Sequence, residues 1–168
     1  MMADQCQNSD ERNIAGEIRM MTYGIALLLH ILAATIWTGG HIVLATIILP
    51  DVLRRKTPQK LLSFEALFER IAMPALLIQV VTGIYLAYHL LPDYSQWHQL
   101  NNPVSHGIIA KLTLLLITVL LALDARFRVM PKLSEDNLGD MAWHIIAVTL
   151  LAILFVATGV SFRTGWLF

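Results

Sequence analysis

Histidine is the residue type in this sequence that is best suited to chemistry. Six histidines occur among 168 residues, of which only 14% are charged. His30 and His41 lie in one long apolar stretch, with Trp37 between them. If this stretch is helical, the eleven-residue spacing turns His41 back to within about 20° of His30 and carries it about 16 Å along the axis. One helix face would then present two imidazoles at two depths.

The remaining histidines are sorted by their distance from the ends of the apolar segments. His144 lies just inside the start of the last segment, at a depth similar to that of His41, and we expect these two side chains to face each other. His106 and His89 lie at the opposite level, where either one would pair with His30. Metal ligation is expected of His30, His41, His106 and His144.

Imidazoles at two levels suit a transmembrane electron carrier, because haem iron accepts axial imidazoles from facing helices. We therefore expect one or two haem b groups, and a catalytic haem would make the protein a membrane oxidoreductase. Copper is the alternative, because imidazole and thioether ligands suit it. Lys111 and Arg70 would bind haem propionates, and Trp37 would pack against a ring. The expected partners are membrane lipid and a quinone or redox protein.

Composition and charge pattern predict the scaffold that must position these side chains. Hydrophobic residues make up 57% of the chain, and soluble domains carry about 25% charged residues. Four segments, uncharged except for Lys111, reach the ~20 residues that span the hydrocarbon core of a bilayer. The sequence thus predicts an all-α, integral membrane four-helix bundle. The expected helices cover about residues 20–50, 58–91, 103–130 and 135–164, within one domain (20–168) that follows a polar tail (1–19).

Prolines and capping residues predict the ends of these helices. Pro50-Asp51 is expected to stop the first helix, and Thr57-Pro58 and Asn102-Pro103 combine a cap with proline at the first helical position. Pro74 should kink the second helix. Ser134-Glu135-Asp136 is expected to cap the fourth helix and to place acidic residues in its first turn.

The distribution of cations predicts the orientation, because cytoplasmic loops are enriched in Lys and Arg. The middle loop, residues 93–103, has none, so we expect both termini and this loop outside the cytoplasm. The twelve Lys and Arg residues equal the twelve Asp and Glu residues in number, and this excludes the basic surface of a nucleic-acid binder. The cations of the first and third loops are Arg54, Arg55, Lys56, Lys60, Arg70, Arg126, Arg128 and Lys132.

Several motifs form a scattered pattern along the predicted helices. They are HILAATIWTGGH at residues 30–41, FERIAMPA at 68–75, HGIIAKL at 106–112 and ARFRVMP at 125–131. This pattern resembles small integral membrane proteins of the CopD family, over nearly all of the chain from His30 to Gly165. The resemblance implies a bacterial inner-membrane location and a role in copper uptake or resistance.

The same residues are more distantly similar to the HemJ family of four-helix protoporphyrinogen oxidases. The shared features are the histidine and tryptophan of the first helix, the Arg…Met-Pro-Ala passage of the second, and a histidine near a lysine in the third. This similarity implies haem b binding and an oxidoreductase activity. His106 and Lys111 are more widely spaced than in HemJ proteins, and His41 and His144 are additional to the HemJ pattern.

Overall fold

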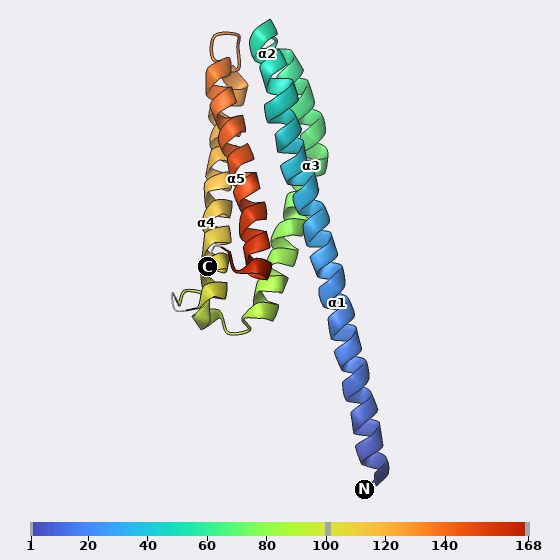
Figure 1. The fold of residues 1–168 in the computed structure, drawn as a ribbon. Coiled ribbons are helices and arrows are strands. Elements are labelled where there is room, and N and C mark those ends of the chain that lie inside the picture. Colours follow the sequence, from blue (N-terminus) through green and yellow to red (C-terminus); the bar gives the residue numbers. More distant parts are fainter. Residues whose placement is uncertain (1, 100–101, 167–168) are drawn as a thin grey trace.

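The computed structural model of the protein describes residues 2–99 and 102–166. Its regular elements are helices, and the described residues contain no strand. Four helical rods are long and apolar enough to cross a membrane, as the sequence predicts (Figure 1). The rods cover Asp10–Arg55, Pro58–Leu90, Pro103–Lys132 and Leu138–Thr164. The all-α fold with four membrane-spanning helices is therefore confirmed.

The first rod continues beyond the predicted stop at Pro50-Asp51. Helix α1 (Met2–Val43) passes through a π-helical turn, Leu44–Ile48, into α2 (Leu49–Arg55). Pro50 lies in the first turn of α2, where a missing backbone N–H is tolerated. The rod ends only at Lys56, whose φ of 51° is left-handed. The π turn thus lets the rod continue through the proline that was expected to end it.

The predicted polar tail is a helical extension of α1. Residues 2–19 continue the same helix, and the side chains described from Asp10 onward in this extension are exposed. Figure 1 shows α1 projecting well past the other helices toward the N-terminus. A helix of 42 residues is about 63 Å long, roughly twice the ~30 Å hydrocarbon core of a bilayer. Part of α1 therefore extends outside the membrane.

The second and third rods begin at Pro58 and Pro103, although the Thr57 side chain makes no capping bond. Helix α3 (Pro58–Leu90) contains Pro74, and Figure 1 shows α3 changing direction along its length. Asn102 caps α4 (Pro103–Asp124) by accepting the N–H of Val104 at 2.9 Å. Beyond α4, the third rod passes through a π turn, Ala125–Val129, and a 3₁₀ turn, Met130–Lys132.

The fourth helix begins later than predicted. Helix α5 (Leu138–Thr164) has Asn137 at its N-cap, so Ser134 is not the cap. The Asn137 side chain instead bonds within the preceding loop, where its Oδ1 accepts the Ser134 N–H at 2.7 Å and its Nδ2 donates to the Lys132 carbonyl at 2.7 Å. These bonds hold residues 134–136 in the loop and leave the acidic pair outside the helix.

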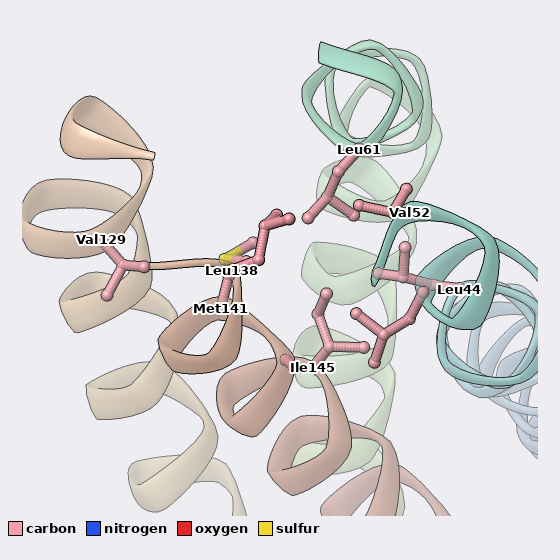
Figure 2. Close-up of a cluster of buried hydrophobic side chains, with 9 residues drawn as sticks. Leu44, Val52, Leu61, Val129, Leu138, Met141 and Ile145 are labelled. Carbon is pink, nitrogen blue, oxygen red and sulfur yellow. The ribbon is translucent and has the colours of Figure 1, made fainter. Parts of the chain in front are cut away.

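The helices pack as an α1–α3 pair beside an α4–α5 pair, and α1 also contacts α5. Both cation-rich segments, residues 54–60 and 126–132, lie at one end of the bundle, which we call the basic end (Figure 1). The largest buried cluster lies near this end and joins both π turns with α2, α3 and α5 (Figure 2). Its most deeply buried members are Leu44, Val52, Leu61 and Met141. Many large apolar side chains elsewhere are exposed, as expected for a surface in contact with lipid.

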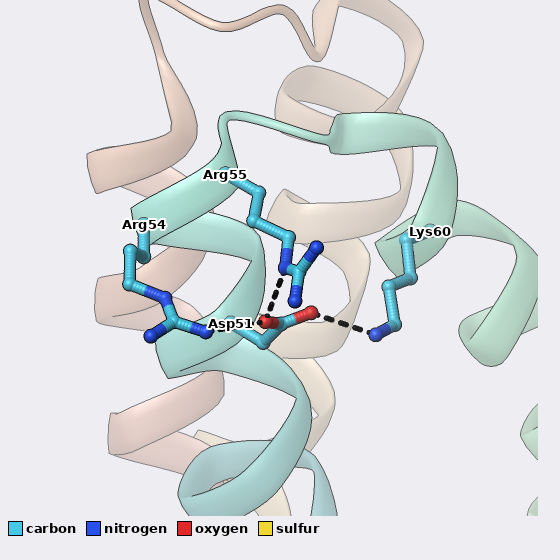
Figure 3. Close-up of polar contacts among 4 residues, drawn as sticks. All are labelled: Asp51, Arg54, Arg55 and Lys60. Carbon is cyan, nitrogen blue, oxygen red and sulfur yellow. Dashed lines mark hydrogen bonds and ion pairs between the residues drawn. The ribbon is translucent and has the colours of Figure 1, made fainter.

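An ionic cluster around Asp51 holds the connection between α2 and α3 (Figure 3). Arg55 Nε and Lys60 Nζ each lie 2.7 Å from a carboxylate oxygen of Asp51, and Arg54 Nη2 lies 3.3 Å away. The cations come from both sides of the turn, so the carboxylate links α2 to the first turn of α3. Exposed ion pairs stabilise a fold only slightly, so this cluster serves mainly to set the geometry of the turn.

Candidate site on the α1–α3 histidine face

His30 of α1 is hydrogen-bonded to α3 inside the apolar part of the bundle. Its Nδ1 lies 3.0 Å from Thr82 Oγ1, and Thr82 is itself buried. Thr82 Oγ1 also lies 2.6 Å from the Ile78 carbonyl, which can only accept. When the hydroxyl donates its one proton to that carbonyl, it accepts from His30, and Nδ1 carries the imidazole proton. A neutral His30 then has its lone pair on Nε2, the state in which imidazole binds a metal.

Three further residues surround the His30 imidazole. Gly83 leaves the space it needs, because a Cβ built at Gly83 would lie 3.1 Å from His30 Cε1. The backbone of Gln79 is within hydrogen-bond reach of the ring, and the Gln79 side-chain Oε1 is buried without a hydrogen-bond partner. The positive charge of Lys111 on α4 acts electrostatically on His30. The ring thus lies in a polar patch within an apolar bundle.

His41 has the same tautomer for a different reason. Its Nδ1 lies 2.8 Å from the Trp37 carbonyl, which has no proton to give, so Nδ1 must be the donor. The ring lies between Trp37 at 4.6 Å and Phe68 of α3 at 5.3 Å, measured between ring centroids. The absence of a side chain at Gly40 leaves room for Phe68, because a Cβ at Gly40 would overlap the Phe68 ring. His41 is thus held by aromatic packing, with Nε2 as its remaining nitrogen.

Both imidazoles of α1 therefore face α3, at two depths, as their spacing predicts. His30 contacts Thr82 and His41 contacts Phe68, and these partners lie fourteen residues apart in α3. The directions of α1 and α3 are opposite, so the later histidine meets the earlier residue of α3 (Figure 1). Trp37 is 8% exposed and contacts the His41 ring, as predicted for a residue of this face.

His144 does not face His41 in this structure. It is 6% exposed, its Nδ1 lies 2.8 Å from the Asp140 carbonyl, and its Nε2 lies 2.7 Å from Asp124 Oδ2. Arg128 also bonds to Asp124 Oδ2, at 2.9 Å. The Asp140 carbonyl can only accept, so His144 Nδ1 donates to it. Both ring nitrogens of His144 are thus engaged in hydrogen bonds, and no contact between its side chain and His41 is described.

His89 and His106, the two predicted partners of His30, have different positions. His89 packs against the rings of Tyr85 at 4.8 Å and Tyr23 at 5.6 Å. Tyr23 precedes His30 by seven residues, so His89 lies about 10 Å further toward the opposite end of the bundle. His106 is half-buried in the first turn of α4. Its level corresponds to the predicted outer position, but no contact between its side chain and His30 is described.

Lys111 and Arg70, the two cations predicted to bind haem propionates, lie in different environments. Lys111 Nζ lies 5.2 Å from the ring centroid of Phe162 on α5, a cation–π distance. Arg70 is exposed and lines a groove between α1 and α3 whose cavity measures about 350 Å³. The other residues lining this groove are apolar and include Ala33, Pro74 and Ala75.

Sequence reasoning missed the α3 and α4 partners of the histidines. Gln79, Thr82 and Gly83 are spaced i, i+3 and i+4, so they share one face of α3. Two polar side chains and a glycine on one face of an apolar segment are a signal that could have identified them. Asp124 is the first acidic residue after a long apolar run. That position is the signal that could have identified it as a partner of a histidine.

The described residues contain no group of three or more His, Cys, Asp or Glu side chains placed to hold a metal ion. The histidine face offers single imidazoles instead, each with Nδ1 engaged and Nε2 directed by that bond. This donor set suits an ion that is bound and released. Copper is one metal that imidazole nitrogen binds well.

Comparison with known proteins identifies the family. Comparison with curated proteins and with solved structures found no match. Residues 62–162, more than half of the chain, match the family described as Copper resistance protein D, or CopD. The matched region begins in α3 and covers α4 and nearly all of α5. The resemblance to HemJ proteins is not shown by these comparisons. The chain therefore belongs to the CopD family of membrane proteins.

Proposed function

We propose that this multi-pass CopD-family protein binds copper as its substrate on the α1–α3 histidine face and moves it between two depths of the bundle. The observation that carries the proposal is the hydrogen bond that each of the two histidines makes through Nδ1. His30 and His41 each commit Nδ1 to a hydrogen bond, which leaves both Nε2 lone pairs for a metal. The family match supports copper as the ion.

The groups that hold the two imidazoles resemble the outer shell of a metal site. Metal-bound histidines usually donate their second ring N–H to an oxygen acceptor, which orients the ring and raises its basicity. Thr82 Oγ1 performs this role for His30, and the Trp37 carbonyl performs it for His41. The eleven-residue spacing separates the two imidazoles by about 16 Å, so a transported ion would occupy them in turn rather than bridge them.

Copper accounts for the arrangement better than two haem groups do. A bis-histidine haem needs two imidazoles that approach one iron from facing helices. The expected partner of His41 is His144, and both nitrogens of that residue are already hydrogen-bonded. Of the two expected partners of His30, His89 packs against Tyr23 and Tyr85 instead, so haem remains an outcome for the experiment to detect.

We also propose a bacterial inner-membrane location in which the basic end faces the cytoplasm. The two cation-rich segments lie together at this end, as the positive-inside rule requires of cytoplasmic loops. Both termini would then lie on the other side of the membrane. In this orientation His41 is the imidazole closer to the cytoplasm and His30 the one closer to the outside.

The test is metal binding by the full-length protein purified in detergent. We expect copper to bind the wild type, and we expect His30→Ala and His41→Ala each to lose part of the bound copper. His98→Ala is the matched control, because His98 is an exposed loop histidine. A visible spectrum recorded on the same sample, expressed with haem supplied, detects haem. Copper binding that survives both α1 substitutions, or a haem spectrum without copper binding, would overturn the proposal.

A further inference from the structure

A second candidate site lies at the basic end, away from the histidine face. A cavity of about 480 Å³ opens there between the end of the third rod and the start of α5. Its lining is rich in polar and charged side chains. The residues that line it are Arg128, Val129, Lys132, Asn137, Asp140, Trp143 and His144.

Two cationic side chains line this cavity. They are those of Arg128 and Lys132, and the His144 ring forms part of the wall. The carboxylates are those of Asp124, shared by Arg128 and His144, and of Asp140, which lines the cavity. Arg128 is therefore already paired with a carboxylate. Among the described residues, no carboxylate lies within ion-pair distance of Lys132, so its charge is available to a ligand.

The start of α5 adds to the positive potential of the cavity. The Asn137 side chain is occupied in the loop and makes no capping bond to α5. The first N–H groups of a 27-residue helix thus remain without a side-chain acceptor, at the positive end of its dipole. Asn137 lines the cavity and marks this helix end. Backbone donors of this kind favour anions, and phosphate in particular.

The position of the cavity indicates the source of the phosphate. Trp143 lines the cavity and is 65% exposed, and tryptophan is enriched at the level of lipid headgroups. Basic pockets near the membrane surface bind the headgroups of anionic lipids. We propose that this cavity binds a phosphate group, presented by an anionic phospholipid headgroup or by free phosphate, with Arg128 and Lys132 as its cationic contacts.

The experiment measures ligand binding to the full-length protein in uncharged detergent by titration calorimetry. The probes are a short-chain phosphatidylglycerol, the matching diacylglycerol without phosphate, and inorganic phosphate. We expect phosphatidylglycerol to bind and the diacylglycerol not to bind. Competition by inorganic phosphate at similar concentration would identify free phosphate as the ligand. Binding of phosphatidylglycerol without such competition would identify the lipid.

Charge-removing variants test the assigned residues. Lys132→Gln should weaken binding roughly fivefold and Arg128→Gln/Lys132→Gln roughly 30-fold, while Lys132→Arg should retain it. Arg54→Gln/Lys56→Gln is the matched control, because it removes two exposed cations from the same end but away from the cavity. Lys132 is exposed, so its single substitution remains informative even if the double variant is unstable. Equal weakening in the control, or equal affinity for the diacylglycerol, would overturn the proposal.

Discussion

The hydrogen bond from His30 to Thr82 offers the sharpest test of the histidine face. Thr82→Val removes the hydroxyl and keeps a β-branched side chain of nearly the same shape. The substitution deletes both the 3.0 Å contact to His30 Nδ1 and the 2.6 Å bond to the Ile78 carbonyl. His30 Nδ1–H then has no hydroxyl acceptor, and the ring is free to change its tautomer or to rotate.

The expected magnitude follows from two separate effects. Losing an outer-shell partner of a ligating histidine typically reduces metal affinity about 10- to 100-fold. Losing the hydrogen bond reduces stability by about 1 kcal/mol, and a donor left unsatisfied in a buried place costs about 1–3 kcal/mol. Because each tenfold change in affinity is about 1.4 kcal/mol, Thr82→Val should lower the free energy of copper binding and the free energy of unfolding by similar amounts. A control variant that loses only the stability term separates the two effects.

The assay is a copper titration of detergent-purified protein together with thermal unfolding of the same samples. Thr118→Val is the matched control: Thr118 is 2% exposed and its hydroxyl bonds only to the Leu114 carbonyl of its own helix, at 2.8 Å. Thr82→Ser restores the hydroxyl and should restore the affinity. If Thr82→Val and Thr118→Val change copper affinity equally, the outer-shell role of Thr82 is refuted.

The remaining predictions concern helix packing, the contact between Asp124 and His144, and the orientation in the membrane. Gly40→Ala should destabilise the α1–α3 contact by about 1–3 kcal/mol, because the added methyl overlaps the Phe68 ring. Gly39→Ala, which meets open space, should leave the melting temperature in detergent nearly unchanged, and equal effects would contradict this reasoning. Asp124→Asn alters the 2.7 Å hydrogen bond to the buried His144 and should lower the free energy of unfolding by about 1–2 kcal/mol; an unchanged unfolding midpoint in denaturant would count against that bond. Cys6 is the one cysteine of the chain, so a membrane-impermeant thiol reagent should label it in intact spheroplasts if the N-terminus lies outside. Labelling that requires membrane disruption would reverse the proposed orientation.

Membrane-spanning structure was predictable because its cause is local. A bilayer demands about 20 apolar residues per helix whatever the neighbouring helices are, and the charge-free segments of the chain meet that demand. The exact ends were less predictable. Pro50 lies inside the first rod because a π turn precedes it, and Ser134 lies outside α5 because Asn137 bonds back to the loop. The first outcome depends on backbone hydrogen bonding and the second on bonds between a side chain and the backbone, and residue types alone specify neither.

Part of the candidate site was also predictable from the sequence, and the rest depended on the tertiary structure. The helical repeat alone placed His30 and His41 on one face of α1, at two depths, because that spacing is intrinsic to the α-helix. Only the packing of antiparallel helices decided what each imidazole meets: Thr82 for His30, Phe68 for His41 and Asp124 for His144. Those partners are distant in the chain, and the hydrogen bonds they make determine which ring nitrogen keeps a lone pair for a metal.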